Sequence, residues 1–181
     1  MPRKFVPFVL SLLLVFLAGG LFLSSAARVP QTGATEAILK ASDITPKIFP
    51  PTVFFRGQTA PVQMRNTAGV HFADGFYFLA GLVDNSGYSS GVREKYQGYL
   101  ITEVSLEIGG QSLKPGAYGF GYLSDGKFVV LDLGNNELLQ TPSQRDAEIK
   151  HPVPFQILAA PNAGNYRLYN GRDFVEFHRV H

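Results

Sequence analysis

The string Gly87-Tyr88-Ser89-Ser90-Gly91 fits the G-x-S-x-G pattern of serine hydrolases. In those enzymes the serine lies on a strained turn between a strand and a helix. Here residues 92–97 are too few for a helix and are followed at once by Gly98 and a predicted strand, so we expect the helix after Ser89 to be missing. A hydrolase that uses Ser89 therefore remains an alternative function and is not the leading one.

Paired carboxylates are the second chemistry to consider, because two acids across a sugar bond can hydrolyse it. Glu103 and Glu107 lie on one predicted strand. Four residues of strand separate them by about 13 Å, which exceeds the roughly 5–9.5 Å of glycosidase pairs. We interpret both as solvent-facing residues. A catalytic carboxylate pair that includes Asp74, Asp84 or Asp132 is not excluded by the sequence.

Histidine spacing gives little support for a metal site. The short-spaced candidates are His71 with Asp74, and His178 with His181. Metal sites usually combine more ligands at closer spacing. Glycine-rich phosphate loops are also absent from the sequence, so we expect neither a metal nor a cofactor.

An aromatic stripe is the best candidate for ligand binding. Tyr118, Phe120 and Tyr122 alternate with Gly119 and Gly121. Flat rings with polar tips can stack on sugars or line an apolar pocket, but such a stripe can equally be core. The glycines behind the rings suggest that other backbone approaches closely there, which favours the core interpretation. The full set of predicted ligand-binding residues is Arg65, His71, Tyr77, Tyr118, Phe120 and Tyr122.

Two predicted strands, 76–83 and 128–133, are apolar on both faces. One face of each can meet the core of an antiparallel sandwich, and the other must be covered. The cover could be a short helix at 34–41, where Ala34, Ala37, Ile38 and Ala41 share one helical face, or the segment 138–154. A bound apolar ligand or a partner surface is the functional alternative.

From Thr52 onward, short runs of aromatic and β-branched residues alternate with turn residues. This pattern predicts a single all-β domain, a sandwich or flattened barrel of about eight to ten antiparallel strands, with one short helix. The run 99–108 is expected to form one strand. Hairpin turns are expected at Gly109-Gly110, at Asp125-Gly126 and at Asn170-Gly171, the last pairing Tyr169 with Arg172.

The string Gly110-Gln111-Ser112-Leu113-Lys114-Pro115-Gly116-Ala117-Tyr118 resembles the G-x-x-L-x-P/A-G-x-Y turn that leads into a strand in small exported bacterial β-sandwich domains of uncharacterised function. The resemblance covers nine residues. It implies the fold class and export, and it carries over no functional residues.

The N-terminus has the pattern of an export signal: the basic residues Arg3 and Lys4, an apolar run over 5–23, and small residues before a cut after Ala27. We expect residues 1–27 to be a signal peptide, or alternatively a membrane anchor, because 19 helical residues span about 28 Å. Residues 28–51, with four prolines, are expected to be a linker with the short helix, and residues 52–181 the β domain.

Charge and cysteine content limit the function further. Without residues 1–27 the chain keeps 14 of its 16 Lys and Arg residues against 14 Asp and Glu, so the mature body is neutral. A neutral, evenly mixed charge pattern argues against nucleic acid as a partner. The chain has no cysteine, so no disulfide stabilises it. We therefore expect an extracytoplasmic, periplasmic or secreted, non-enzymatic binding module for an apolar or carbohydrate ligand or an envelope protein partner. The alternatives are an envelope hydrolase and a self-associating structural protein.

Overall fold

The computed structural model of this protein describes residues 35–180, and the expected signal peptide therefore lies outside the described residues. Fourteen strands and one short helix make up this part of the chain. In order they are β1 (Ala37–Leu39), β2 (Thr52–Phe55), β3 (Gln58–His71), β4 (Tyr77–Val83), α1 (Ser90–Lys95), β5 (Gly98–Thr102), β6 (Leu106–Ile108), β7 (Gln111–Leu113), β8 (Gly116–Tyr122), β9 (Lys127–Leu131), β10 (Glu137–Pro142), β11 (Gln144–Arg145), β12 (Phe155–Ala159), β13 (Asn165–Asn170) and β14 (Asp173–Arg179).

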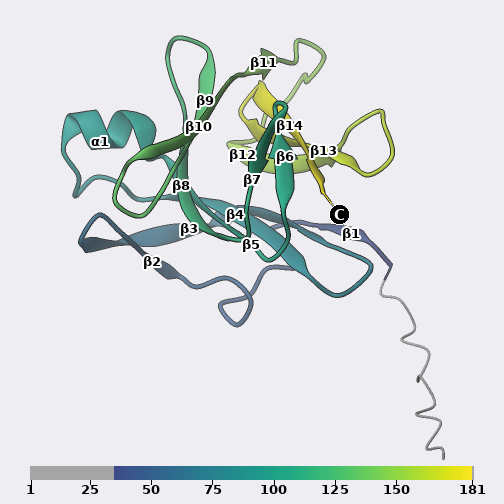
Figure 1. The fold of residues 1–181 in the computed structure, drawn as a ribbon, viewed down its shortest axis with the longest axis horizontal. Coiled ribbons are helices and arrows are strands. Elements are labelled where there is room, and N and C mark those ends of the chain that lie inside the picture. The colour runs from purple at the N-terminus through teal and green to yellow at the C-terminus, as the bar shows by residue number, and fades with distance from the viewer. Residues whose placement is uncertain (1–34, 181) are drawn as a thin grey trace, which may run out of the picture. The chain divides into compact units, whose positions relative to one another are not determined.

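The strands form two antiparallel sheets that pack against each other (Figure 1). The large sheet has the order β1-β3-β4-β5-β8-β9-β10, and β2 also pairs with β3. The small sheet has the order β12-β13-β14-β6-β7, and β11 also pairs with β14. This arrangement confirms the predicted all-β sandwich. It has more strands than predicted. Strands of two or three residues leave little alternation in the sequence, and four strands are this short: β1, β6, β7 and β11.

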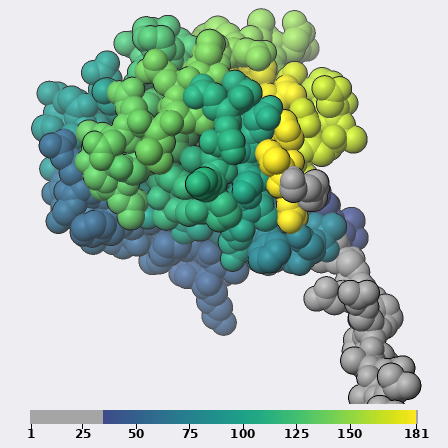
Figure 2. Space-filling model, in the orientation of Figure 1, coloured from purple at the N-terminus to yellow at the C-terminus, as the bar shows by residue number. Residues whose placement is uncertain are grey.

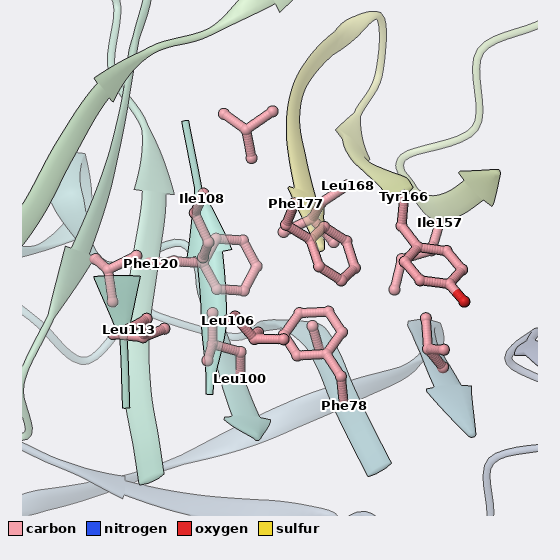
Figure 3. Packing of buried hydrophobic residues seen from close by; sticks show 14 of the residues in the cluster. Phe78, Leu100, Leu106, Ile108, Leu113, Phe120, Ile157, Tyr166, Leu168 and Phe177 are labelled. Carbon is pink, nitrogen blue, oxygen red and sulfur yellow. The ribbon is translucent and has the colours of Figure 1, made fainter. Parts of the chain in front are cut away.

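The main core fills the space between the two sheets. Phe78 of the large sheet faces Phe177 of the small sheet, with ring centroids 4.6 Å apart (Figure 3). Leu100, Leu106 and Phe120 are completely buried around this pair. Aromatic contacts of this kind add to the stabilisation from burial alone.

A second apolar core lies on the other side of the large sheet. Leu79, Val129 and Leu131 point into it from the two strands that are apolar on both faces. The cover comes from residues 44–62 and 88–96, with the Phe55 and Tyr96 rings stacked 3.8 Å apart. The predicted cover by the segment 138–154 is wrong, because Leu139 packs in the main core. The predicted cover by a helix at 34–41 is wrong in form, because residues 37–39 are the strand β1, but Leu39 of this strand does pack against the second core.

The short helix exists, but its predicted position at 34–41 is wrong. Residues 37–39 form β1, which pairs with β3 so that Ala37 lies opposite His71 and Leu39 opposite Gly69. An isolated helix of eight residues is marginal, whereas an edge strand satisfies its backbone by pairing with a preformed neighbour. The helix is α1, and from β1 onward the expected linker is part of the sandwich.

The predicted strand over 99–108 is divided between the sheets. Residues 98–102 form β5 in the large sheet and residues 106–108 form β6 in the small sheet. The hydroxyl of Thr102 donates a hydrogen bond to the Val104 carbonyl and accepts one from the Val104 N–H, which stabilises the crossing. The alternating side chains stay buried along the whole run because both halves face the same core.

The three predicted hairpins are confirmed. Gly109, Gly110, Gly126 and Gly171 all have positive φ, as the tight turns require. At the last hairpin, Asn170 pairs with Asp173, so the loop is Gly171-Arg172 and the predicted Tyr169–Arg172 pair is wrong by two residues in register. A shift of two leaves every side chain on its predicted face. In the space-filling view, the yellow surface of β14 lies against the teal surface of β6, its neighbour in the small sheet (Figure 2).

Candidate ligand-binding groove

A groove opens on one side of the sandwich, where the edge strands of the two sheets come together. β1 is the edge of the large sheet, β12 is the edge of the small sheet, and β12 contacts both β1 and β3. The groove has a volume of about 490 Å³. It is lined by Ile38, Leu39, Lys40, Ala41, Arg65, Asn66, Thr67, Ala68, Val153, Pro154, Phe155, Gln156, Ile157, Leu158 and Ala159.

The floor of the groove belongs to the main core. Ala68, Phe155 and Ile157 are almost completely buried, and Ile38 packs against them from β1. Val153 stands at the rim with 43% of its surface exposed. The groove thus lies at the edge of the main core, with buried apolar residues on its floor.

A bulge in β3 brings Arg65 and Asn66 to the groove. Val62 pairs with Val83 and Thr67 with Gly81, so the residues between them outnumber those on β4 and the strand must bulge. Extra residues of this kind bend a strand and re-aim its side chains.

Side chains of the bulge hold its shape. The Gln63 amide donates to the Val83 carbonyl at 3.0 Å, the Asn66 amide to Gln63 Oε1 at 2.8 Å, and the Thr67 hydroxyl to the Met64 carbonyl at 2.9 Å. This hydrogen bonding fixes the backbone that carries Arg65.

The charged residues that line the groove are both cations, Lys40 and Arg65, and both are exposed. The lining contains no carboxylate, histidine or serine. Its only hydroxyl, that of Thr67, is used within the bulge. The groove therefore combines apolar walls with a positive rim and contains no carboxylate, imidazole or free hydroxyl group.

Of the predicted ligand-binding residues, Arg65 lines this groove. His71 and Tyr77 lie one opposite the other on β3 and β4, with their rings stacked 4.4 Å apart. The Tyr77 backbone N–H donates to the Glu103 carboxylate. These two rings make a small half-buried platform away from the groove.

The aromatic stripe of β8 belongs mainly to the core. Phe120 is completely buried, and the buried Tyr122 hydroxyl donates to the Leu168 carbonyl across the two sheets. Burial raises the pKa of Tyr122 well above its ordinary value, so it stays neutral. Tyr118 is half-buried, and its hydroxyl donates to the Lys114 carbonyl.

Ser89 lies at the start of α1, so the expectation that no helix follows it is wrong. The helix has six residues, and Ser89 has an unstrained φ of −62°. A nucleophile elbow requires strain at the serine. The exposed Ser89 side chain does not cap the helix, and nothing in its geometry marks a nucleophile.

Of the candidate metal ligands, His178 lies on β14, and its expected partner His181 lies outside the described residues. Asp74 pairs with Arg179 at 2.7 Å, and the Arg179 guanidinium lowers the pKa of Asp74. Within residues 35–180 no group of three or more His, Asp or Glu side chains could hold a metal ion. The same residues include no helix of the length and apolarity needed to cross a membrane.

Comparisons of this chain with protein-family models, with curated proteins and with solved structures found no match. The functional argument therefore rests on the geometry of the groove. Apart from Arg65, its residues were not predicted, because the two edge strands are distant in sequence and only the pairing of the sheets brings them together.

Proposed function

We propose that this protein is an exported, non-enzymatic binding module that holds a small apolar or amphipathic molecule in the groove between β1 and β12. The observation that carries the proposal is that the groove floor is the main core itself, reached from solvent between two sheet edges. Ligand sites are typically concave, mostly apolar and about 300–1,000 Å³ in volume. The groove fits all three criteria.

The chemistry of the lining supports binding over catalysis. Hydrolysis needs a nucleophile or an activated water next to a base, and neither a histidine nor a carboxylate lines the groove. A hydrolase that uses Ser89 has no support from its unstrained φ or its exposed position. Binding of an apolar group needs only the walls that are present.

We expect the uncharged fluorescent dye N-phenyl-1-naphthylamine to bind the protein with saturable enhancement of its emission. Val153→Asp should weaken binding of the dye about three- to tenfold, because it replaces an apolar side chain of the lining with a charged one. Val180→Asp is the matched control: Val180 is 40% exposed, against 43% for Val153, and does not line the groove. Fluorescence titration measures both affinities.

Two results would contradict this proposal. One is a wild-type protein that fails to bind the dye, and the other is an equal loss of affinity in both variants. Sedimentation of the ligand-free protein should accompany the titration, because the free edges of β1 and β12 could instead pair with a second copy. Dimers that persist in excess dye would favour the self-associating structural protein.

A further inference from the structure

We infer that the ligand is a single-chain amphiphile with an acidic headgroup, its tail on the groove floor and its headgroup between Lys40 and Arg65. The inference rests on the proposed function, since it names the ligand class of the same groove. It starts from the charge of the lining, which carries two cations and no acid.

The two cations lie toward the same end of the groove. β1 and β3 are antiparallel, and Leu39 lies opposite Gly69. Lys40, the residue after β1, therefore lies toward the part of β3 that contains the bulge at Arg65. Ile38 and Leu39 of β1 lie on the far side of Lys40 from the bulge, and Ala159 at the end of β12 lies near Ala37 and Ile38. An amphiphile with one charged end and one apolar chain matches this polarity.

Neither cation is neutralised within the part of the chain that the structure describes. Lys40 and Arg65 form no ion pair there. The nearby Asp43 carboxylate accepts hydrogen bonds from the Lys40 backbone N–H and the Ser42 hydroxyl, so it is engaged at the chain turn. Both cationic side chains are therefore available to an anion.

The backbone at Arg65 is held in place by its neighbours. Its backbone is part of the bulge that Gln63, Asn66 and Thr67 stabilise with hydrogen bonds. A guanidinium on a fixed backbone can bind a carboxylate through two parallel N–H donors. A positively charged headgroup would meet two like charges at the same place.

The test compares three probes that share a ten-carbon tail: decanoate, decanol and decyltrimethylammonium. Each displaces N-phenyl-1-naphthylamine from the wild-type protein, below its critical micelle concentration. We expect decanoate to bind at least fivefold more tightly than decanol, and decyltrimethylammonium to bind most weakly. Raising the salt from 50 to 500 mM should weaken decanoate and leave decanol nearly constant, because the headgroup contact is exposed to screening.

The double variant Lys40→Gln, Arg65→Gln should bring the ratio of decanoate to decanol affinity close to one. The matched control is Arg93→Gln, Lys114→Gln, which removes the same charge from exposed positions outside the groove and should keep the wild-type ratio. Equal affinities of the three probes for the wild-type protein would overturn the acidic headgroup and leave the apolar groove standing. Tightest binding of decyltrimethylammonium would overturn it too, and failure of every probe would overturn both proposals.

Discussion

Positions 119 and 121 of β8 have room for a hydrogen atom and nothing larger. A Cβ at Gly121 would lie 2.2 Å from the Lys95 carbonyl oxygen, and a Cβ at Gly119 would lie 2.6 Å from the Phe55 ring. The two glycines therefore allow α1 and the second core to pack directly on the large sheet. The close approach of other backbone was predicted from these glycines, and it is confirmed at Gly121.

We expect Gly121→Ala to destabilise the domain by about 1–3 kcal/mol, because the colliding atom is backbone and cannot rotate away. Gly91→Ala is the control: it lies in α1 with no atom within 4 Å of the added methyl group, and should stabilise by roughly 0.5 kcal/mol. Urea denaturation of the two variants and the wild-type protein measures both changes. A neutral Gly121→Ala would mean that α1 can move off the sheet.

The predicted binding residues show what a single sequence can reveal. Alternation identified Phe120 and Tyr122 as sharing one face, and both are in the core. Only the folded sheets decide whether such a face meets protein or ligand. Arg65 was predicted as one of several polar-tipped residues beside the strands that are apolar on both faces. The bulge that brings it to the groove depends on the register of β3 with β4, which has no clear pattern in the sequence.

The run 99–108 illustrates the same limit for strands. Its alternation correctly predicted which side chains are buried, but alternation does not report which sheet a strand joins. Thr102, Glu103 and Val104 continue the pattern through the crossing. A bend that keeps the same faces toward the core leaves no trace in the burial pattern.

The segment between β1 and β2 was expected to be a linker because of its prolines, yet it is part of the second core. Phe49 is completely buried, whereas its neighbour Ile48 is 37% exposed. We expect Phe49→Ala to cost about 3–5 kcal/mol of unfolding free energy, and Ile48→Ala to cost less than about 1 kcal/mol.

Thermal or urea denaturation separates the two alanine variants directly. Equal, small effects of both substitutions would mean that this segment contributes little to the fold, as a linker would. The large sheet would then need another cover for Leu79 and Val129.

The two strands that are apolar on both faces correctly predicted that the large sheet is covered on both of its faces. They required a layer on each side of the large sheet, and both layers exist. The source of the second layer was not predicted, because its residues come from irregular segments around β2 and α1. Such segments lack the periodicity from which packing faces are predicted.

Export of the whole chain is open to a direct measurement. When the gene is expressed with its own N-terminus, we expect the extracytoplasmic fraction to contain a chain that begins at Arg28, because Ser25 and Ala27 fit a signal-peptidase site. Intact-mass spectrometry of the purified protein gives the answer. A full-length mass in the membrane fraction would contradict cleavage and favour the anchor.

The groove floor has a consequence for how this protein can evolve. Larger side chains at Ala159, which is exposed and lines the groove, would fill part of the space between the sheets and raise the thermal stability of the empty domain. The same changes would remove the space that a ligand needs. If the groove is the site of function, selection for stability favours larger side chains in it and selection for ligand binding favours smaller ones.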